Sequence, residues 1–468
     1  MNTPTQRKKK EIHLPDTYLM ILVIMLIVAV LSYIMPAGTY DTITDPVTGK
    51  SVVDATSFHF VERSPISFMG FLLSITEGLV SNANVIFFAF LVCGFFQIIT
   101  DTGSLDRLID VMVAKLSNKA FLILPIFGVA MCLLGSTGMM LTPTIALIPV
   151  GLALSKKLKV DQLFGVAIIY CCIFGGFGAS PYAPNSVVLA QEFSDVEPMS
   201  GFAPRAVMWV LVTIVTVTYL IRYAKKVQKD PKNSIMGTIS FPESDAKEIQ
   251  IGKATLIRDG LVVLSIFVGF GIYIYGAITK NWGLGYMNGI FFCVGVFSGI
   301  MGRMKAQQII DSFIKGCRNF VYGGILIGLA GSISILMKEG MILHTLIYYM
   351  SLPLQHVPPV ISSVLMYLVD LVCNFFIPSV TGKAPVVMPL MAPLADVIGL
   401  TRQIAVAAYA FSDAFGNTFI PTHAILISSL AIAKVPFEKW VKFQIPLFLI
   451  WSAMSCAFLI IAVMFGYH

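Results

Sequence analysis

Nine long apolar stretches constrain this chain more than any other feature. A helix needs about 20 apolar residues to cross a hydrocarbon core roughly 30 Å thick, and each stretch comes close to that length. The stretches cover residues 17–35, 84–100, 163–179, 204–222, 259–277, 284–302, 318–337, 404–420 and 443–466. The chain is 57% hydrophobic and only 12% charged, which lies outside the range of soluble globular proteins. The sequence therefore predicts an all-α polytopic membrane protein in a lipid bilayer.

The basic residues predict how the chain is oriented. Lys and Arg gather in the cytoplasmic loops of membrane proteins, so a net charge of +7 does not indicate a nucleic-acid partner. The start "MNTPTQRKKK" predicts a cytoplasmic N-terminus over residues 1–15, and "RYAKKVQKDPK" (222–232) predicts a cytoplasmic linker. The acidic segment "EFSDVEP" (192–198) belongs outside. We expect a multi-pass protein of the cell membrane, the plasma or inner membrane.

Two segments conflict with simple spanning helices. This orientation places both ends of residues 120–155 inside and both ends of residues 358–397 outside. Each segment is too long and apolar for a loop, yet too short for two ordinary spans. Their midpoints, "GSTGMMLTPT" (135–144) and "NFFIPSVTGKAP" (374–385), carry small, hydroxyl and proline residues, as a turn buried in protein at membrane depth requires. The sequence predicts two re-entrant hairpins that point at each other.

The two halves of the chain show a weak internal repeat. At a shift of 240 residues, Gly176 falls on Gly416 and Pro181 on Pro421. Matching halves of opposite orientation indicate an inverted-topology repeat, which is typical of secondary transporters. The predicted parts are a first repeat at 16–223, a cytoplasmic linker at 224–258, a connecting helix at 259–277 and a second repeat at 284–468.

A helix broken by glycine and proline follows each hairpin, at residues 163–190 and 402–434. Helix ends freed by a break leave N–H and C=O groups that favour anions and cations respectively. The two tips and two breaks are therefore predicted to converge on one site for a small solute with a carboxylate. The predicted substrate-binding residues are Ser136, Thr137, Thr142, Asn185, Asn374, Ser379, Thr381, Gly382, Lys383, Asn417 and Thr418.

Charged residues inside apolar segments mark the predicted ion chemistry. A buried lysine costs roughly 2.5–3.5 kcal/mol on insertion scales, so Lys383 is expected to contact substrate. The alternative is a structural pairing of Lys383 with Asp370, Asp396 or Asp413. Asp413, Asp370 and Ser180 are predicted to bind a coupling cation or carry a proton. We expect no cofactor beyond H⁺ or Na⁺, and no metal site, because the eight cysteines form no CxxC pattern.

Three segments resemble a known family. They are "NFFIPSVTGKAPVVMPLMAPLADVIGLTRQIAVAAYAFSDAFGNTFIPT" (374–422), "VPFEKWVKF" (435–443) and "IMPAGTYD" (34–41). They resemble the DcuC-type four-carbon dicarboxylate carriers, in the YfcC-like and arginine/ornithine antiporter branch, and the resemblance runs over nearly the whole chain. It implies membership of the ion transporter superfamily, with a scaffold domain, a transport domain carrying the two hairpins, a homodimer and elevator-type alternating access.

The chain departs from that family pattern at both hairpins. Relatives typically have a tip such as "PSGSG" followed by glutamine, where this chain has "PSVTGK" (378–383), and many carry an acidic pair where this chain reads "GMMLT" (138–142). A gained lysine and missing acids favour an anionic or zwitterionic carboxylate.

We therefore expect a secondary active transporter for a dicarboxylate or an amino acid, driven by H⁺, Na⁺ or exchange. The alternative is a basic amino-acid antiporter in which Asp413 and Asp370 supply negative charge. An ion channel fits less well, and no enzyme motif or nucleotide-binding GxxxxGK[ST] loop is present.

Overall fold

The computed structural model describes residues 17–44, 51–54, 56–104, 107, 123–138, 140–237, 253–280 and 282–467, and this part of the chain is nearly all helical. Its longer helices are α1 (Thr17–Ile34), α2 (Phe68–Ser81), α3 (Ala83–Asp101), α5 (Ile123–Ser136), α6 (Thr144–Lys157), α7 (Gln162–Gly178), α9 (Phe202–Lys229), α10 (Lys253–Lys280), α11 (Leu284–Met301), α12 (Ala306–Glu339), α14 (Pro359–Phe376), α15 (Val380–Val397), α16 (Arg402–Gly416), α17 (Ala424–Ala433) and α18 (Phe437–Met464). Short elements are η2 (Pro184–Val188), α8 (Leu189–Glu192), η3 (Pro231–Asn233), α13 (Leu343–Ser351) and η4 (Leu352–His356). Strands β1 (Gly38–Thr39) and β4 (His59–Phe60) pair, as do β2 (Thr42–Thr44) and β3 (Ser51–Val53).

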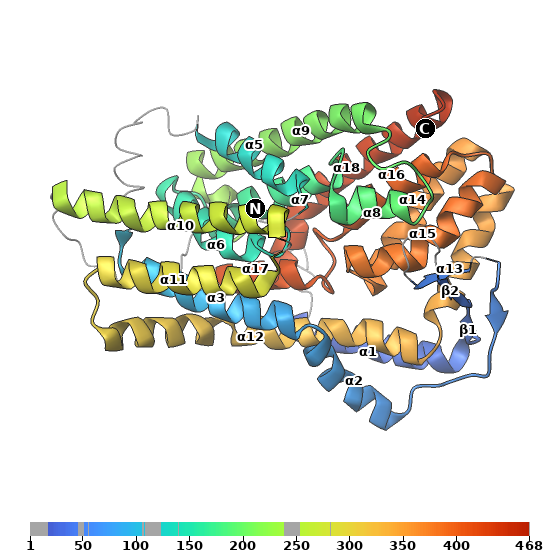
Figure 1. The fold of residues 1–468 in the computed structure, drawn as a ribbon, viewed down its shortest axis with the longest axis horizontal. Coiled ribbons are helices and arrows are strands. Elements are labelled where there is room, and N and C mark those ends of the chain that lie inside the picture. The colour runs from blue at the N-terminus through green and yellow to red at the C-terminus, as the bar shows by residue number, and fades with distance from the viewer. Residues whose placement is uncertain are drawn as a thin grey trace, which may run out of the picture.

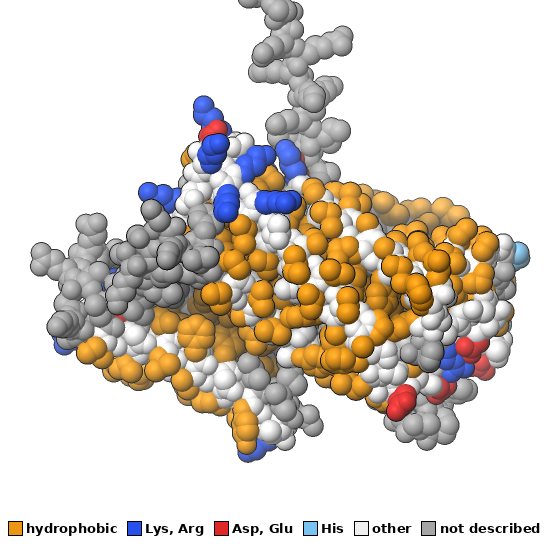
Figure 2. Space-filling view, turned by 90° about the horizontal axis from the view of Figure 1, so that it is seen from above, with side chains coloured by type: hydrophobic (Ala, Val, Ile, Leu, Met, Phe, Trp, Pro, Cys, Tyr) orange, Lys and Arg blue, Asp and Glu red, His pale blue; other side chains and the backbone are white. Residues whose placement is uncertain are grey.

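The helices have the length and surface of a membrane protein. Five of them, α3, α9, α12, α14 and α18, are long and apolar enough to cross a membrane within the described ranges. Large apolar side chains such as Phe87, Val207 and Ile461 are more than half exposed. Figure 2 shows a broad band of hydrophobic side chains, with charged side chains gathered toward its edges. Soluble proteins rarely expose an apolar surface of this extent.

The helices form two groups that lie side by side (Figure 1). In one group, α12 packs against α1, α2 and α3, while α3 contacts α11, which in turn contacts α10. In the other, α7 packs against α5, α6, α9 and α16, and α16 packs against α14, α15 and α18. α17 contacts both α12 and α6, so it joins the two groups. Residues that the sequence separates by hundreds of positions thus meet around α7 and α16.

Two helical hairpins lie within the second group. α5 and α6 have 14 residues each, about 21 Å of helix, which is less than the roughly 30 Å of a hydrocarbon core. Their connection turns at Gly138, whose φ of +69° is in the left-handed region that favours glycine. The α14–α15 hairpin has a shorter connection, from Ile377 to Ser379. α15 contains three prolines four residues apart, Pro385, Pro389 and Pro393.

α5 and α7 cross at two glycines. A Cβ atom on Gly135 would overlap the backbone carbonyl of Ile173, and one on Gly176 would overlap the carbonyl of Cys132. Small residues allow this close backbone approach, as they do at many membrane helix interfaces. The crossing holds the first hairpin arm against the helix that follows the hairpin.

Both of the helices that follow a hairpin are interrupted. α7 ends at Gly178, and residues 179–183 separate it from the π-helical turn η2. α16 ends at Gly416, and residues 417–423 separate it from α17. Each break contains a proline, Pro181 or Pro421, which cannot donate a backbone hydrogen bond. The glycine and proline pattern therefore places these two interruptions correctly.

A buried ion pair joins the end of α3 to α10. Arg107 donates to both carboxylate oxygens of Asp259, through Nε and Nη2, each at 2.7 Å. The hydroxyl of Ser104 donates to the same carboxylate at 2.8 Å. The Asp259 side chain is only 3% exposed, so these partners replace water around its charge.

We expect Asp259→Asn to lower the free energy of unfolding by about 1.5–3 kcal/mol, because it weakens charge-assisted hydrogen bonds to a buried group. Thermal denaturation of detergent-purified protein measures this change. The matched control is Asp311→Asn on α12, where the carboxylate is exposed and accepts from Gln307. Equal melting temperatures for the two variants would contradict the prediction.

Candidate functional site

Lys383 lies in the first turn of α15, at the tip of the α14–α15 hairpin. Ser379 caps this helix, since its hydroxyl accepts from the Gly382 backbone N–H at 3.2 Å and its carbonyl accepts from the Lys383 N–H at 2.8 Å. The cap turns the Lys383 side chain into the protein, where it has no exposed surface. A serine followed by a helix start thus fixes where the lysine enters the core.

Lys383 pairs with Asp413 of α16. The Nζ atom lies 3.3 Å from Asp413 Oδ1, and both side chains are fully buried. The same ammonium lies 4.5 Å from the ring centroid of Tyr409, one turn earlier on α16, in a cation–π contact. The Tyr409 hydroxyl donates to the Val380 carbonyl at 2.5 Å, which fastens the start of α15 to α16. Although ion-paired, neither Nζ nor Oδ1 forms an aligned hydrogen bond within the described part of the chain.

Two asparagines tie this pair to the broken helix. Asn374, at the end of α14, donates its amide to the Asp413 carbonyl at 3.0 Å and to Asn417 Oδ1 at 3.2 Å. Asn417, the first residue of the break, donates to Asp413 Oδ2 at 3.3 Å. The hairpin tip and the helix break are therefore one polar cluster, which we call the Lys383 cluster: Asp370, Asn374, Lys383, Asp413 and Asn417.

Asp370 adds a second buried carboxylate. It lies one turn before Asn374 on α14 and is 1% exposed. It is within electrostatic range of both Lys383 and Asp413. Neither of its oxygens has a hydrogen-bond partner among the residues that the structure describes, and the same is true of Asn374 Oδ1. With both carboxylates ionised, the cluster would hold two negative charges and one positive charge.

The α5–α6 hairpin makes a separate polar cluster with the break after α7. The Ser180 hydroxyl donates to the Ser136 carbonyl at 2.7 Å and accepts from the Ala183 N–H at 3.0 Å. The Asn185 amide donates to the Gly138 carbonyl at 3.0 Å, while its own Oδ1 is buried without a partner in the described ranges. This second cluster contains no ionised side chain.

The other predicted site residues have more local surroundings. Thr137 Oγ1 donates back to the Leu134 carbonyl at 2.7 Å, and Thr142 is half-buried in the turn. Thr381 lies exposed at the α14–α15 tip, as do Ser379 and Gly382. Thr418 is fully buried, where its hydroxyl donates to the Phe415 carbonyl at 2.6 Å.

The structure also reveals polar residues around the second break that the sequence pattern does not mark. The Tyr170 hydroxyl lies 2.9 Å from the Asn417 carbonyl and 2.8 Å from Nδ1 of the buried His423. Trp440 and Gln444 of α18 donate to the carbonyl and hydroxyl of Thr418, at 2.7 and 2.8 Å. Tyrosine, tryptophan and glutamine in apolar helices usually have packing roles, so the sequence does not mark these three residues as part of a site. His423 is the exception, because it follows a helix break.

Two clusters are thus present, and η2, which carries Asn185, packs against both α15 and α16. α7 ends at Gly178, where it packs closely against α16. A Cβ atom on Gly178 would lie 2.8 Å from the Cβ atom of Ala414. Each cluster combines a hairpin tip with the break that follows it in the sequence. Only the Lys383 cluster contains ionised groups, so it is the candidate site for charged solutes or ions.

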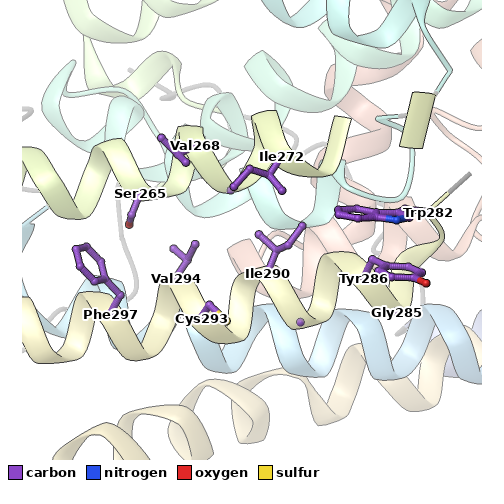
Figure 3. A pocket seen from close by; sticks show the side chains of 12 residues that line it. Ser265, Val268, Ile272, Trp282, Gly285, Tyr286, Ile290, Cys293, Val294 and Phe297 are labelled. Atoms are coloured by element: carbon purple, nitrogen blue, oxygen red, sulfur yellow. The ribbon is translucent and has the colours of Figure 1, made fainter. Parts of the chain in front are cut away.

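An apolar groove between α10 and α11 offers no comparable chemistry (Figure 3). It has a volume of about 810 Å³ and is lined by residues such as Ile272, Tyr286 and Val294. Trp282 stacks on Tyr286 at one end, with ring centroids 4.8 Å apart. None of the predicted site residues line this groove, and its almost wholly apolar wall suits hydrocarbon.

Comparison with known proteins identifies the family of the chain. The chain is 27% identical to "Putative basic amino acid antiporter YfcC" of Escherichia coli (strain K12), over 97% of both chains. It is 25% identical to an uncharacterized protein of Haemophilus influenzae, over 94% of this chain and 95% of the other. Two solved transporters align at low similarity: YdaH of Alcanivorax borkumensis (TM-score 0.42, 14% identity, 97% and 99% coverage) and MtrF of Neisseria gonorrhoeae (0.44, 13%, 97% and 96%). The family model described as "C4-dicarboxylate anaerobic carrier" matches residues 14–464, so the chain is a multi-pass membrane protein that belongs to the DcuC family of transporters.

Proposed function

We propose that the protein is a secondary active transporter of a small carboxylate-bearing metabolite, a dicarboxylate or an amino acid. The observation that carries this proposal is the fully buried Lys383 ammonium at the junction of a hairpin tip and a helix break. A buried ammonium is costly and needs an anion beside it. Membership of a family named for dicarboxylate carriage supports a carboxylate as the solute.

The proposed transport cycle uses the two hairpins. We assign α5–α6 and α14–α15 as re-entrant hairpins of an inverted repeat spanning 16–223 and 284–468, with α10 as the connecting helix. The short arms of α5 and α6, and the break after each hairpin, support this assignment. The helices around α12 serve as the scaffold, and those around α7 and α16 as the moving part of an elevator. We also propose a homodimer in the inner membrane, with the N-terminus in the cytoplasm.

In this proposal, the polar residues have distinct roles. Lys383 contacts the solute carboxylate, with Asn374 and Asn417 beside it, and the exposed tip residues meet the solute as it enters. Those tip residues are Ser379, Thr381 and Gly382. Ser136 and Asn185 of the second cluster contribute hydroxyl and amide contacts, together with Thr137 and Thr142 of the same hairpin connection, and Thr418 supports the second break. Coupling to H⁺ or Na⁺ is assigned to Asp413, Asp370 and Ser180.

A basic amino-acid antiporter is the second candidate. The name of the Escherichia coli relative supports it, as does the excess of carboxylates over lysine in the Lys383 cluster. A cationic side chain would then bind Asp370 and displace Lys383 from Asp413. In the first candidate, Lys383 attracts the carboxylate of the solute. In the second, Lys383 competes with a cationic solute group for the carboxylates of the cluster.

Counterflow in proteoliposomes separates these functions. Vesicles loaded with dicarboxylates, neutral amino acids or basic amino acids are tested for uptake of each labelled solute, with and without a sodium gradient. We expect exchange of an acidic or neutral carboxylate, because Lys383 supplies the positive charge. Exchange of arginine or ornithine alone would favour the antiporter, and conduction without exchange would contradict both.

A further inference from the structure

We infer that Asp413 occupies the place of the solute carboxylate on Lys383, and that it takes up a proton when the solute displaces it. The inference rests on the proposed function and adds the coupling ion, its residue and its stoichiometry: one H⁺ for each carboxylate bound to Lys383.

The charge of Lys383 is already neutralised by one carboxylate. One ammonium neutralises one carboxylate, and Lys383 already lies 3.3 Å from Asp413 Oδ1. A solute carboxylate that binds Lys383 therefore replaces Asp413. The displaced carboxylate would be ionised and unpaired in a site with no exposed surface, which is strongly unfavourable.

The surroundings of Asp413 leave a proton as the means of neutralising it. The titratable groups that face it are Asp370 of α14, Lys383 of α15 and Tyr409 on its own helix, and Cys373 of α14 lies beside Asp370 and Lys383. Tyr170 of α7 donates a hydrogen bond from its hydroxyl to the backbone carbonyl of Asn417, whose side chain contacts Asp413. Lys383 is the one cation that ion-pairs with Asp413 among the described residues, and the acids beside it oppose a second negative charge.

The hydrogen-bond geometry allows the exchange of partners. Separating Lys383 Nζ from Asp413 Oδ1 breaks their ion pair, and a solute carboxylate on Lys383 replaces it with another ion pair of the same charges. Asn417 holds the other oxygen, Oδ2, at 3.3 Å. A proton from the aqueous phase that binds Oδ1 leaves that contact intact, while Lys383 stays charged and pairs with the solute carboxylate.

The test is a wild-type stoichiometry measurement together with three variants. In proteoliposomes containing the pH dye pyranine, wild-type uptake should bring in one proton per solute molecule, with a net charge of +1 for a neutral amino acid and −1 for a dicarboxylate dianion. An imposed pH gradient should drive accumulation without sodium. Accumulation that requires a sodium gradient, or uptake that moves no proton, would overturn the inference, and neither result depends on a variant folding.

Asp413→Asn should lower pH-driven accumulation at least tenfold relative to the counterflow rate of the same variant, because the amide cannot take up a proton. Asp413→Glu should retain pH-driven accumulation with a displaced pH profile. Asp370→Asn should retain pH-driven accumulation as well. Loss of pH-driven accumulation in Asp370→Asn would assign the proton to Asp370 in place of Asp413. The control is Asp311→Asn.

An absence of counterflow in the wild type would refute the proposed function, whereas counterflow without proton movement would refute only this coupling.

Discussion

Lys383→Gln is expected to reduce carboxylate counterflow about 10- to 100-fold. The glutamine amide can still donate a hydrogen bond, but a contact to a charged group contributes about 1.5–3 kcal/mol, and each 1.4 kcal/mol changes affinity tenfold. Initial counterflow rates over a range of solute concentrations measure the loss. Lys442→Gln on α18, where the lysine is exposed, is the matched control and should transport normally.

A second variant separates transport from folding. Lys383→Gln alone leaves Asp370 and Asp413 as two buried carboxylates without a cation, at a cost of about 3–5 kcal/mol. Lys383→Gln with Asp413→Asn leaves Asp370 as the one such carboxylate of this cluster and should recover part of the yield of monodisperse protein without restoring transport. If the double variant recovered transport as well, Lys383 would serve only to neutralise Asp413.

Gly176→Ala is expected to prevent assembly of the second helix group. The added Cβ atom would overlap the backbone carbonyl of Cys132, and a carbonyl within a helix cannot rotate away as a side chain can. Overpacking by one methyl group commonly costs 1–3 kcal/mol, and we expect more than about 3 kcal/mol here because backbone meets backbone. The measurement is the fraction of protein that elutes as a single species after detergent extraction.

The control for this variant is Gly271→Ala on α10. A Cβ atom there meets nothing within 4 Å, and alanine favours a helix over glycine by about 0.5–1 kcal/mol. The control should therefore melt at the same temperature as the wild type or slightly higher. Normal elution of Gly176→Ala would show that α5 and α7 do not cross as closely as described.

The sequence predicted the helical fold better than the site. Apolar length identifies membrane helices directly, and the glycines and prolines at Gly178, Pro181, Gly416 and Pro421 locate the two breaks, because both effects act locally along the chain. The convergence of all four interruptions on one site remains a prediction, although η2, which carries Asn185, packs against α15 and α16.

The partner of Lys383 shows where sequence reasoning stops. A lysine in an apolar segment is conspicuous, but three carboxylates could have served as its partner. The structure pairs Lys383 with Asp413, while Asp396 binds Arg402 at 2.9 Å near the surface. The choice depends on how α15 packs on α16, which no local pattern encodes. Tyr170 and Gln444 were missed for the same reason, because their roles depend on tertiary contacts.

The three prolines of α15 affect how the Lys383 cluster can open. Pro385, Pro389 and Pro393 lack the N–H groups that would bond to the carbonyls four residues earlier, so three consecutive turns lack a backbone hydrogen bond on one side. A helix of this kind has low bending stiffness, and flexing it sacrifices little hydrogen bonding. We therefore expect bending of α15 to expose Lys383 while α14 keeps its place within the hairpin.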